Sequence, residues 1–335
     1  MNTSVSKSRL YDVAKCITTI LVVVAHATRM YTPAGAIPAA KQSAFLRNFT
    51  NYVYVFHMPL FVMLSGCVFG YCIERGKYSD VLAFVKNKGK RLLIPYAAFG
   101  ILYVAPVMHM LRLTNLGYMS YVVNGIVLSK DSRHLWYLLA LFWIFLICIL
   151  MRPLLIKGTK GLVISGAVSL LLFAASGCMP NVLQLSAACN YQLFFFAGIL
   201  FNRFYSDIER LFHKFRMIGY LLPAALLMMF VSNPNMLTEY AYKGIGLVMM
   251  MFICWALLCR FPDVLGHPIL KRIKQNSFGI YLFHPMIIYV LFALLGKRDI
   301  SPIFLSVFAS AAAILLSVYA TGLMRKLRLH LLIGE

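Results

Sequence analysis

The sequence predicts an all-α polytopic membrane protein: a single bundle of about ten transmembrane helices with both termini in the cytoplasm. Of the 335 residues, 61% are hydrophobic and only 13% are charged, whereas soluble domains average about 45–50% and about 25%. Many apolar runs reach the ~20 residues that a helix needs to cross a hydrocarbon core ~30 Å thick. These runs are unbroken, so they lack the alternating polarity of barrel strands.

The apolar runs place ten predicted spans between the clusters of charged residues. In chain order they cover residues 10–31, 52–73, 92–112, 135–156, 161–178, 182–201, 217–231, 236–259, 277–295 and 302–324. In the inner segment 202–216, apolar residues recur among charged ones, which predicts a short amphipathic helix on the inner surface. The outer segments 32–51 and 113–134 are long enough to fold over an opening. We find no internal repeat and predict one membrane domain over residues 1–335.

The formal net charge of +22 follows the predicted topology. With the N-terminus inside, 22 of the 32 Lys and Arg fall in inner segments and 9 in outer segments or outer helix ends, while Lys15 lies within the first span. This is the positive-inside asymmetry that orients membrane proteins. We therefore expect membrane lipids around the chain and no nucleic-acid partner.

Neither the cysteines nor any short motif predicts a metal or a permanently bound cofactor. The 8 cysteines lie mostly within predicted spans and show no paired metal spacing, among them Cys16, Cys67, Cys148, Cys189 and Cys254. Such cysteines are typical small buried hydrophobes. The sequence contains no Gly-rich phosphate loop, zinc motif or nucleophile elbow.

The first span carries charged groups that lipid would leave unsatisfied. Asp12, Lys15, Thr19 and His26 fall within one narrow stripe, because a helix advances ~100° per residue. The charges and the lack of a small-residue cleavage site distinguish this span from a cleaved signal peptide. A stripe of this kind faces the bundle interior or a water-filled cavity, which favours a functional site. The periodicity equally allows a structural role, in which Asp12 pairs with Lys15 and His26 bonds a neighbouring carbonyl.

The spacing within this span resembles a signature of the acyltransferase-3 family. Ten residues separate Lys15 from His26, as ten separate a basic residue from a histidine on the family's first helix. The family usually has Arg where this chain has Lys15. Lys keeps the positive charge but lacks the planar guanidinium, which can donate two parallel hydrogen bonds to one ligand. The string Asp-x-x-Lys followed by Val-Val-x-Ala-His is similar to the fucose 4-O-acetylase-like branch in particular.

Four later segments resemble the same family in the same order and extend the resemblance over most of the chain. They are residues 56–61 with Ser65 and Gly66, Lys88-x-x-Arg91 with residues 92–96, residues 134–138, and residues 277–285. The last segment reads Ser-x-x-Ile-Tyr-x-x-His, in which the tyrosine is Tyr281 and the histidine is His284.

The resemblance implies a multi-pass O-acyltransferase of the bacterial cell (inner) membrane. Members move an acyl group, usually acetyl, from cytoplasmic acyl-CoA to a sugar hydroxyl of an exported glycan or a lipid-linked saccharide. Acetyl-CoA or another acyl-CoA is then a co-substrate, with no cofactor bound permanently. The site residues that we expect are catalytic His26, Lys15 and Asp12; acyl-donor-binding Lys88, Arg91, Tyr281 and His284; and acceptor-side His57, Ser65, His134 and Trp136.

Histidine suits the acceptor step, because it is the side chain best matched to take a hydroxyl proton near neutral pH. His26 lies sixteen residues beyond Leu10, or ~24 Å along a helix, in the outer half of the bilayer. His57 enters from the outer side and reaches a similar depth. His57 is equally well explained as a core histidine beside a proline-distorted turn.

The donor-side residues each have a second explanation. Basic side chains at a helix start, such as Lys88 and Arg91, suit the phosphates of coenzyme A. They also suit plain topology signals or contacts with anionic lipid head groups. Tyr281 and His284 fit either the path of the pantetheine arm or hydrogen bonds between helices.

Other functions compete with acyl transfer. A transporter or flippase for an acylated or lipid-linked sugar would show inverted repeats and broken helices in matching halves, and we see neither clearly. A non-catalytic partner in glycan synthesis would show degraded motifs, whereas only Lys15 departs from the family pattern. O-succinyl transfer in exopolysaccharide export is a further alternative.

Overall fold

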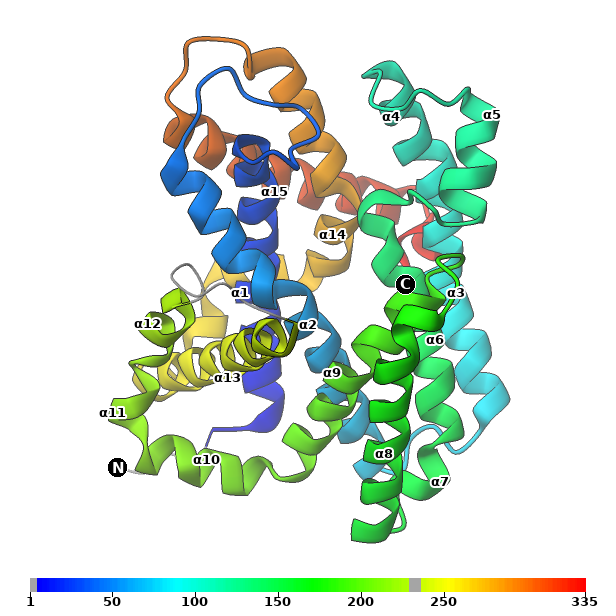
Figure 1. The fold of residues 1–335 in the computed structure, drawn as a ribbon, viewed down its shortest axis with the longest axis vertical. Helices are drawn as coiled ribbons and strands as arrows, with labels where there is room; N and C mark the ends of the chain where they lie inside the picture. Colours follow the sequence, from blue (N-terminus) through cyan, green and yellow to red (C-terminus); the bar gives the residue numbers. More distant parts are fainter. Residues whose placement is uncertain (1–4, 229–235) are drawn as a thin grey trace.

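The computed structural model describes residues 5–228 and 236–335, and all regular elements within these ranges are helical (Figure 1). This confirms the predicted fold class. The longer helices are α1 (Lys7–Thr28), α2 (Ala44–Glu74), α3 (Val81–Phe99), α6 (Trp136–Leu150), α8 (Thr159–Ala175), α9 (Leu185–Arg203), α10 (Tyr205–Lys214), α13 (Met236–Arg260), α14 (Pro268–Leu295) and α15 (Pro302–Lys326). The shorter ones are α4 (Ala105–Met110), α5 (Tyr118–Tyr121), α7 (Arg152–Leu155), α11 (Arg216–Gly219) and α12 (Leu222–Leu227).

Nine helical segments of the described chain are long and apolar enough to cross a membrane, and they correspond to nine of the ten predicted spans. The exception is the predicted span 217–231. Its described part is the shorter apolar stretch Arg216–Leu227, divided into α11 and α12. Pro223 lies in the first turn of α12 and has no N–H for the carbonyl one turn earlier, so a continuous helix is interrupted there. Residues 229–231 of that span lie outside the described residues.

Several helices begin two or three turns before the apolar runs that predicted them. Ser43 caps α2 and Asp80 caps α3, each accepting an N–H from the first turn, at 3.3 and 2.9 Å. Pro268 starts α14, where its fixed φ is already helical. Capping residues determine where these helices begin, whereas hydropathy predicts only the part of each helix that lipid can cover. The predicted amphipathic helix is α10, and the outer segment 113–134 holds α5 and the π-helical stretch Val122–Val127.

The helix ends gather as an alternating topology requires. Lys7, at the start of α1, donates to the carbonyl oxygen of Asn202 at 2.8 Å and pairs with Glu74 at 3.4 Å. These contacts join the ends of α1, α2 and α9 that were predicted to lie inside, which we call the inner end. At the opposite, outer end, Thr50 donates to Thr28 at 2.7 Å and ties α2 to α1.

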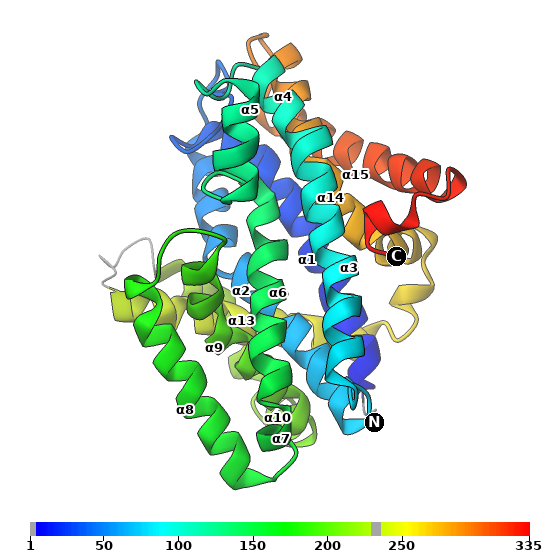
Figure 2. The ribbon, with the colours of Figure 1, turned by 90° about the vertical axis from the view of Figure 1, so that its right-hand side faces the viewer.

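Close helix packing positions the elements that carry the candidate residues. Helix α1 contacts α2, α13, α14 and α15 (Figure 1), and α9 packs against α6, α8 and α2 (Figure 2). Where α2 meets α9, a Cβ added to Gly66 would lie 2.0 Å from the carbonyl oxygen of Phe195. A Cβ added to Gly198 would lie 2.0 Å from that of Met63. Only glycine lets two helix backbones approach this closely.

Candidate active site

A cavity of about 990 Å³ reaches from the inner end of the bundle to the outer end. Its inner part is lined by Lys15 and Arg91, and its outer part by Arg29 and Arg133. The cavity brings together every residue that the sequence predicted for the site, although their roles stay predictions. The lining includes Asp12, Lys15, His26, His57, Ser65, Lys88, Arg91, His134, Trp136, Tyr281 and His284.

The two charged residues at the inner part of α1 do not pair with each other. The carboxylate of Asp12 lies 2.6 Å from the ammonium group of Lys274 on α14. Lys15 forms no ion pair with any carboxylate of residues 5–228 or 236–335. Asp12 therefore forms its ion pair with Lys274 and not with Lys15, and Lys15 lines the cavity without an ion pair in the described ranges.

Lys88 is held by aromatic rings. Its ammonium group lies 3.9 Å from the ring centroid of Phe145, 5.4 Å from that of Phe84 and 5.9 Å from that of Tyr78. Cation–π attraction of this kind strengthens as water is excluded. Lys90, two residues further on, does not line the cavity, so the structure distinguishes the two lysines of the basic cluster.

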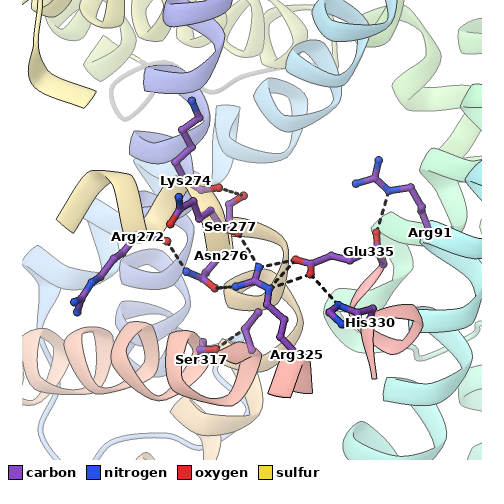
Figure 3. A network of polar contacts seen from close by, with 12 residues as sticks. Arg91, Arg272, Lys274, Asn276, Ser277, Ser317, Arg325, His330 and Glu335 are labelled. Atoms are coloured by element: carbon purple, nitrogen blue, oxygen red, sulfur yellow. Dashed lines mark hydrogen bonds and ion pairs between the residues drawn. The ribbon is translucent and has the colours of Figure 1, made fainter. Parts of the chain in front are cut away.

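Arg91 is joined to the C-terminal segment, residues 330–335 (Figure 3). Its Nε donates to the carbonyl oxygen of Gly334 at 2.9 Å, and Gly334 also lines the cavity. The neighbouring carboxylate of Glu335 accepts a hydrogen bond from Nε of Arg325 at 2.9 Å. That bond lowers the pKa of Glu335 below its ordinary value. The 3₁₀ turn His330–Ile333 thereby packs against α3 and α15, an arrangement that the sequence did not predict.

Four histidines surround the middle and outer part of the cavity. The ring centroids of His26 and His284 lie 5.0 Å apart, and those of His284 and His134 lie 6.0 Å apart. The ring of Tyr54 lies next to those of both His57 and His26, with centroid-to-centroid distances of 4.5 and 6.1 Å. Helices α1, α2 and α14 and the turn before α6 each contribute one histidine, so the cluster depends on the packing of all four elements.

Hydrogen bonds assign the protons of two of these rings. Nδ1 of His284 lies 2.7 Å from the carbonyl oxygen of Ile280, and Nε2 of His134 lies 3.1 Å from that of Leu282. A carbonyl can only accept, so each of these nitrogens donates and the other ring nitrogen is an acceptor. The acceptor nitrogens of both rings are buried without a partner in the described chain, as is Nδ1 of His26. A neutral imidazole nitrogen without a hydrogen-bond partner can accept a proton.

Hydroxyl groups and aromatic rings connect the remaining candidates. The Ser65 hydroxyl lies 3.2 Å from that of Tyr137, and the Tyr281 hydroxyl donates to the backbone carbonyl of His134. Ser65 follows His57 by eight residues on α2, so it lies ~12 Å nearer the inner end. The predicted donor-side Tyr281 thus neighbours the predicted acceptor-side His134, and the cavity does not separate the two groups.

The sequence did not predict the charged residues at the outer end of the cavity as site residues. Arg29, Lys130, Asp131 and Arg133 line it there, whereas the sequence identified the three basic ones only as outer charges. Their presence in outer segments, where positive charge is scarce, was the available signal.

The fold and the site together define a polytopic helical membrane protein with an internal cavity that charged, histidine and aromatic side chains line. The chain belongs to the acyltransferase-3 family, since that family's acyltransferase domain matches residues 10–322. This confirms the family that the motifs predicted and identifies the protein as a membrane acyltransferase. The fucose 4-O-acetylase-like branch stays a prediction. No curated protein and no solved structure matches the chain significantly.

Proposed function

We propose that this acyltransferase moves an acyl group, most often acetyl, from cytoplasmic acyl-CoA to a hydroxyl of an exported glycan or a lipid-linked saccharide in a bacterial inner membrane. The supporting observation is the cavity that reaches both ends of the bundle. A donor and an acceptor on opposite sides of the bilayer can meet in it, and only the acyl group has to pass between them.

The inner end of the cavity suits the donor. Lys15, Lys88 and Arg91 line it, and charge-assisted hydrogen bonds from such groups hold phosphates well. His26 follows Lys15 by eleven positions along α1, which corresponds to ~17 Å. A pantetheine arm laid along α1 would carry the thioester from the basic inner end towards the histidines.

The histidines suit the transfer step. The acceptor oxygen attacks the thioester carbonyl carbon while a histidine nitrogen takes the hydroxyl proton. The carbon–sulfur bond then breaks, and the proton passes from the imidazolium to the departing sulfur, so the products are the sugar ester and free CoA thiol. His26 is our first candidate for this base. His284, whose Nδ1 is held by Ile280 and whose Nε2 is unpartnered in the described chain, is the second.

The test uses purified protein in lipid nanodiscs with a glycan extract and acyl-labelled acetyl-CoA or succinyl-CoA. We expect release of CoA thiol and a matching gain of label in the glycan, with acetyl-CoA preferred. A preference for succinyl-CoA would instead establish an O-succinyltransferase. No thiol release with either donor, combined with movement of unmodified glycan across proteoliposomes, would establish a transporter.

A further inference from the structure

The outer end of the cavity concentrates positive charge on the side of the membrane where it is scarcest. Three basic residues, Arg29, Lys130 and Arg133, line it together with one carboxylate, that of Asp131. Tyr289, which also lines the cavity, lies within electrostatic reach of Arg29, Arg133 and Asp131, so these three charged groups lie near one another. A cleft lined by one sign of charge raises the local concentration of ligands of the opposite sign.

The charge of Arg29 is held in place without being neutralised. Its guanidinium carbon lies 5.0 Å from the ring centroid of Tyr54, and its Nη1 donates to the Tyr54 hydroxyl at 3.2 Å. Its Nε donates to the carbonyl oxygen of Ala34 at 3.1 Å. Across the described ranges, no carboxylate forms an ion pair with Arg29 or Lys130. A guanidinium has five N–H donors, so donors remain for a ligand.

Arg133 is positioned by a strained pair of loops. Ser129 and Arg133 have φ of 55° and 50°, and Leu183 and Gln184 have φ of 54° and 60°, all in the left-handed region that non-glycine residues avoid. The loops are tied together where Nε2 of Gln184 donates to the carbonyl oxygen of Ser129 at 2.6 Å. Strain of this kind persists where the surrounding structure holds it, and it concentrates at ligand sites. Asp131, 3.2 Å from Nε of Arg133, neutralises only one of the three cations.

Aromatic rings near the outer starts of α6 and α9 can take a sugar. Trp136 and Tyr191 line the same cavity, with ring centroids 5.3 Å apart and planes inclined by 42°. The C–H faces of a sugar ring pack on aromatic faces, while the sugar hydroxyls bond to polar groups at the rim. The outer end therefore offers a platform for the ring and a cationic cluster for an anionic substituent.

We propose that the acceptor is a negatively charged saccharide, whose carboxylate or phosphate binds Arg29, Lys130 and Arg133 while its ring packs on Trp136 and Tyr191. This inference rests on the proposed function, because it takes the outer end of the cavity as the acceptor site. It adds a selection by charge that acyl transfer alone does not require.

The test measures binding to the purified protein in nanodiscs through tryptophan fluorescence, at matched ionic strength. The probes are methyl glucuronide, glucose 1-phosphate and neutral methyl glucoside, so that the carboxylate and phosphate arms are separate. We expect at least one charged probe to bind about tenfold or more tightly than the neutral one. In Arg29→Gln and Arg133→Gln this preference should fall below about threefold, and added salt should weaken it.

Two variants keep the test decisive. Lys130→Gln changes an exposed side chain and should reduce the preference even if the arginine variants fold poorly. Arg298→Gln, an exposed outer arginine that does not line the cavity, should leave it unchanged. Equal binding of charged and neutral probes by wild-type protein would overturn the charge selection, whether or not CoA release continues. Charge-selective binding without any CoA release would instead overturn the proposed function.

Discussion

At the scale of single residues, the histidines of the cavity differ in their hydrogen bonds to the backbone. His57 and His284 each place Nδ1 beside the carbonyl oxygen one turn earlier on their own helix, at 3.1 and 2.7 Å. His26 has no such bond within the described ranges, and its Nδ1 is unpartnered. A ring without a structural hydrogen bond has little to lose structurally when it is replaced, which makes His26 a clean position to test.

We predict that His26→Ala lowers transfer to the acceptor by about 10²–10⁴-fold, the usual contribution of a general base. His26→Gln should be nearly as poor, because an amide can hydrogen-bond but cannot hold the proton. Transfer rates measured on protein that elutes as a folded species would check both. A rescue by Gln would indicate a structural histidine, and near-normal rates in both variants would move the test to His284→Gln.

Lys15 offers a second test of chemistry against structure. We expect Lys15→Arg to retain or increase the rate, because it restores the residue usual in the family and adds a two-point contact. Lys15→Ala should lower the rate, because an anionic group of the ligand would lose its partner. The fold should tolerate this change, since it leaves no described carboxylate without its ion pair. Initial rates at several acyl-CoA concentrations decide this, and equal rates for Lys15→Ala and wild type would remove Lys15 from the site.

At the scale of elements, α3 and the C-terminal segment share the inner end of the cavity. Arg91 uses Nε for Gly334, and its two terminal nitrogens remain for another ligand. The element that presents the donor-side charge is therefore also the one on which residues 330–335 dock. Donor binding and docking of this segment can be separated by experiment.

For the donor site, Arg91→Ala and Lys88→Ala should each weaken acyl-CoA binding by more than about tenfold, because a charge-assisted contact contributes about 1.5–3 kcal/mol. Titration calorimetry on the purified protein measures this. Lys90→Ala is the matched control, since it removes the same charge from α3 without altering the cavity lining. If all three variants bind acyl-CoA like wild type, the basic cluster is only a topology signal.

For the C-terminal segment, Glu335→Gln should increase amide hydrogen exchange in residues 330–335 at neutral pH. Arg325 lowers the pKa of Glu335, so the pair stabilises docking above the carboxylate's ordinary pKa of about 4.3. This stabilisation is lost as pH falls through the lowered pKa, and there the wild type should come to resemble the variant. Exchange corrected for its intrinsic pH dependence checks both points, with Asp263→Asn as a control. Unchanged protection in Glu335→Gln would refute the role of this pair.

At the scale of the whole molecule, hydropathy and charge predicted most of the fold. In the described part of the predicted span 217–231 the structure has the short helices α11 and α12 instead, because an apolar sum does not register the missing N–H of Pro223. The motifs found residues on five helical segments that the structure brings to one cavity. They could not find Arg29, Arg133 or the docked segment 330–335, since contacts between distant parts of the chain arise only from tertiary packing.

The topology remains a prediction that reporter fusions can test. A reporter placed after Glu335 or within residues 74–91 should be cytoplasmic, and one within residues 113–134 should be outside. The charge asymmetry motivates this assignment, and the gathering of Lys7, Glu74 and Asn202 at one end agrees with it. With the N-terminus inside, a C-terminal reporter found outside would mean an odd number of crossings, such as the nine spanning helices of the described residues alone would give, and would contradict the assignment of both termini to the cytoplasm.

The close contact of α2 with α9 at Gly66 and Gly198 has a consequence for inherited variation. Neither glycine lines the cavity, yet the contact determines how α2, with His57 and Ser65, lies against α9. A single methyl group at either position would push apart two backbones that have no side chain to yield. Selection should then act against substitutions of Gly198 as strongly as against those of a residue that contacts substrate. A variant of Gly198 that loses activity could be mistaken for one that lacks a catalytic residue.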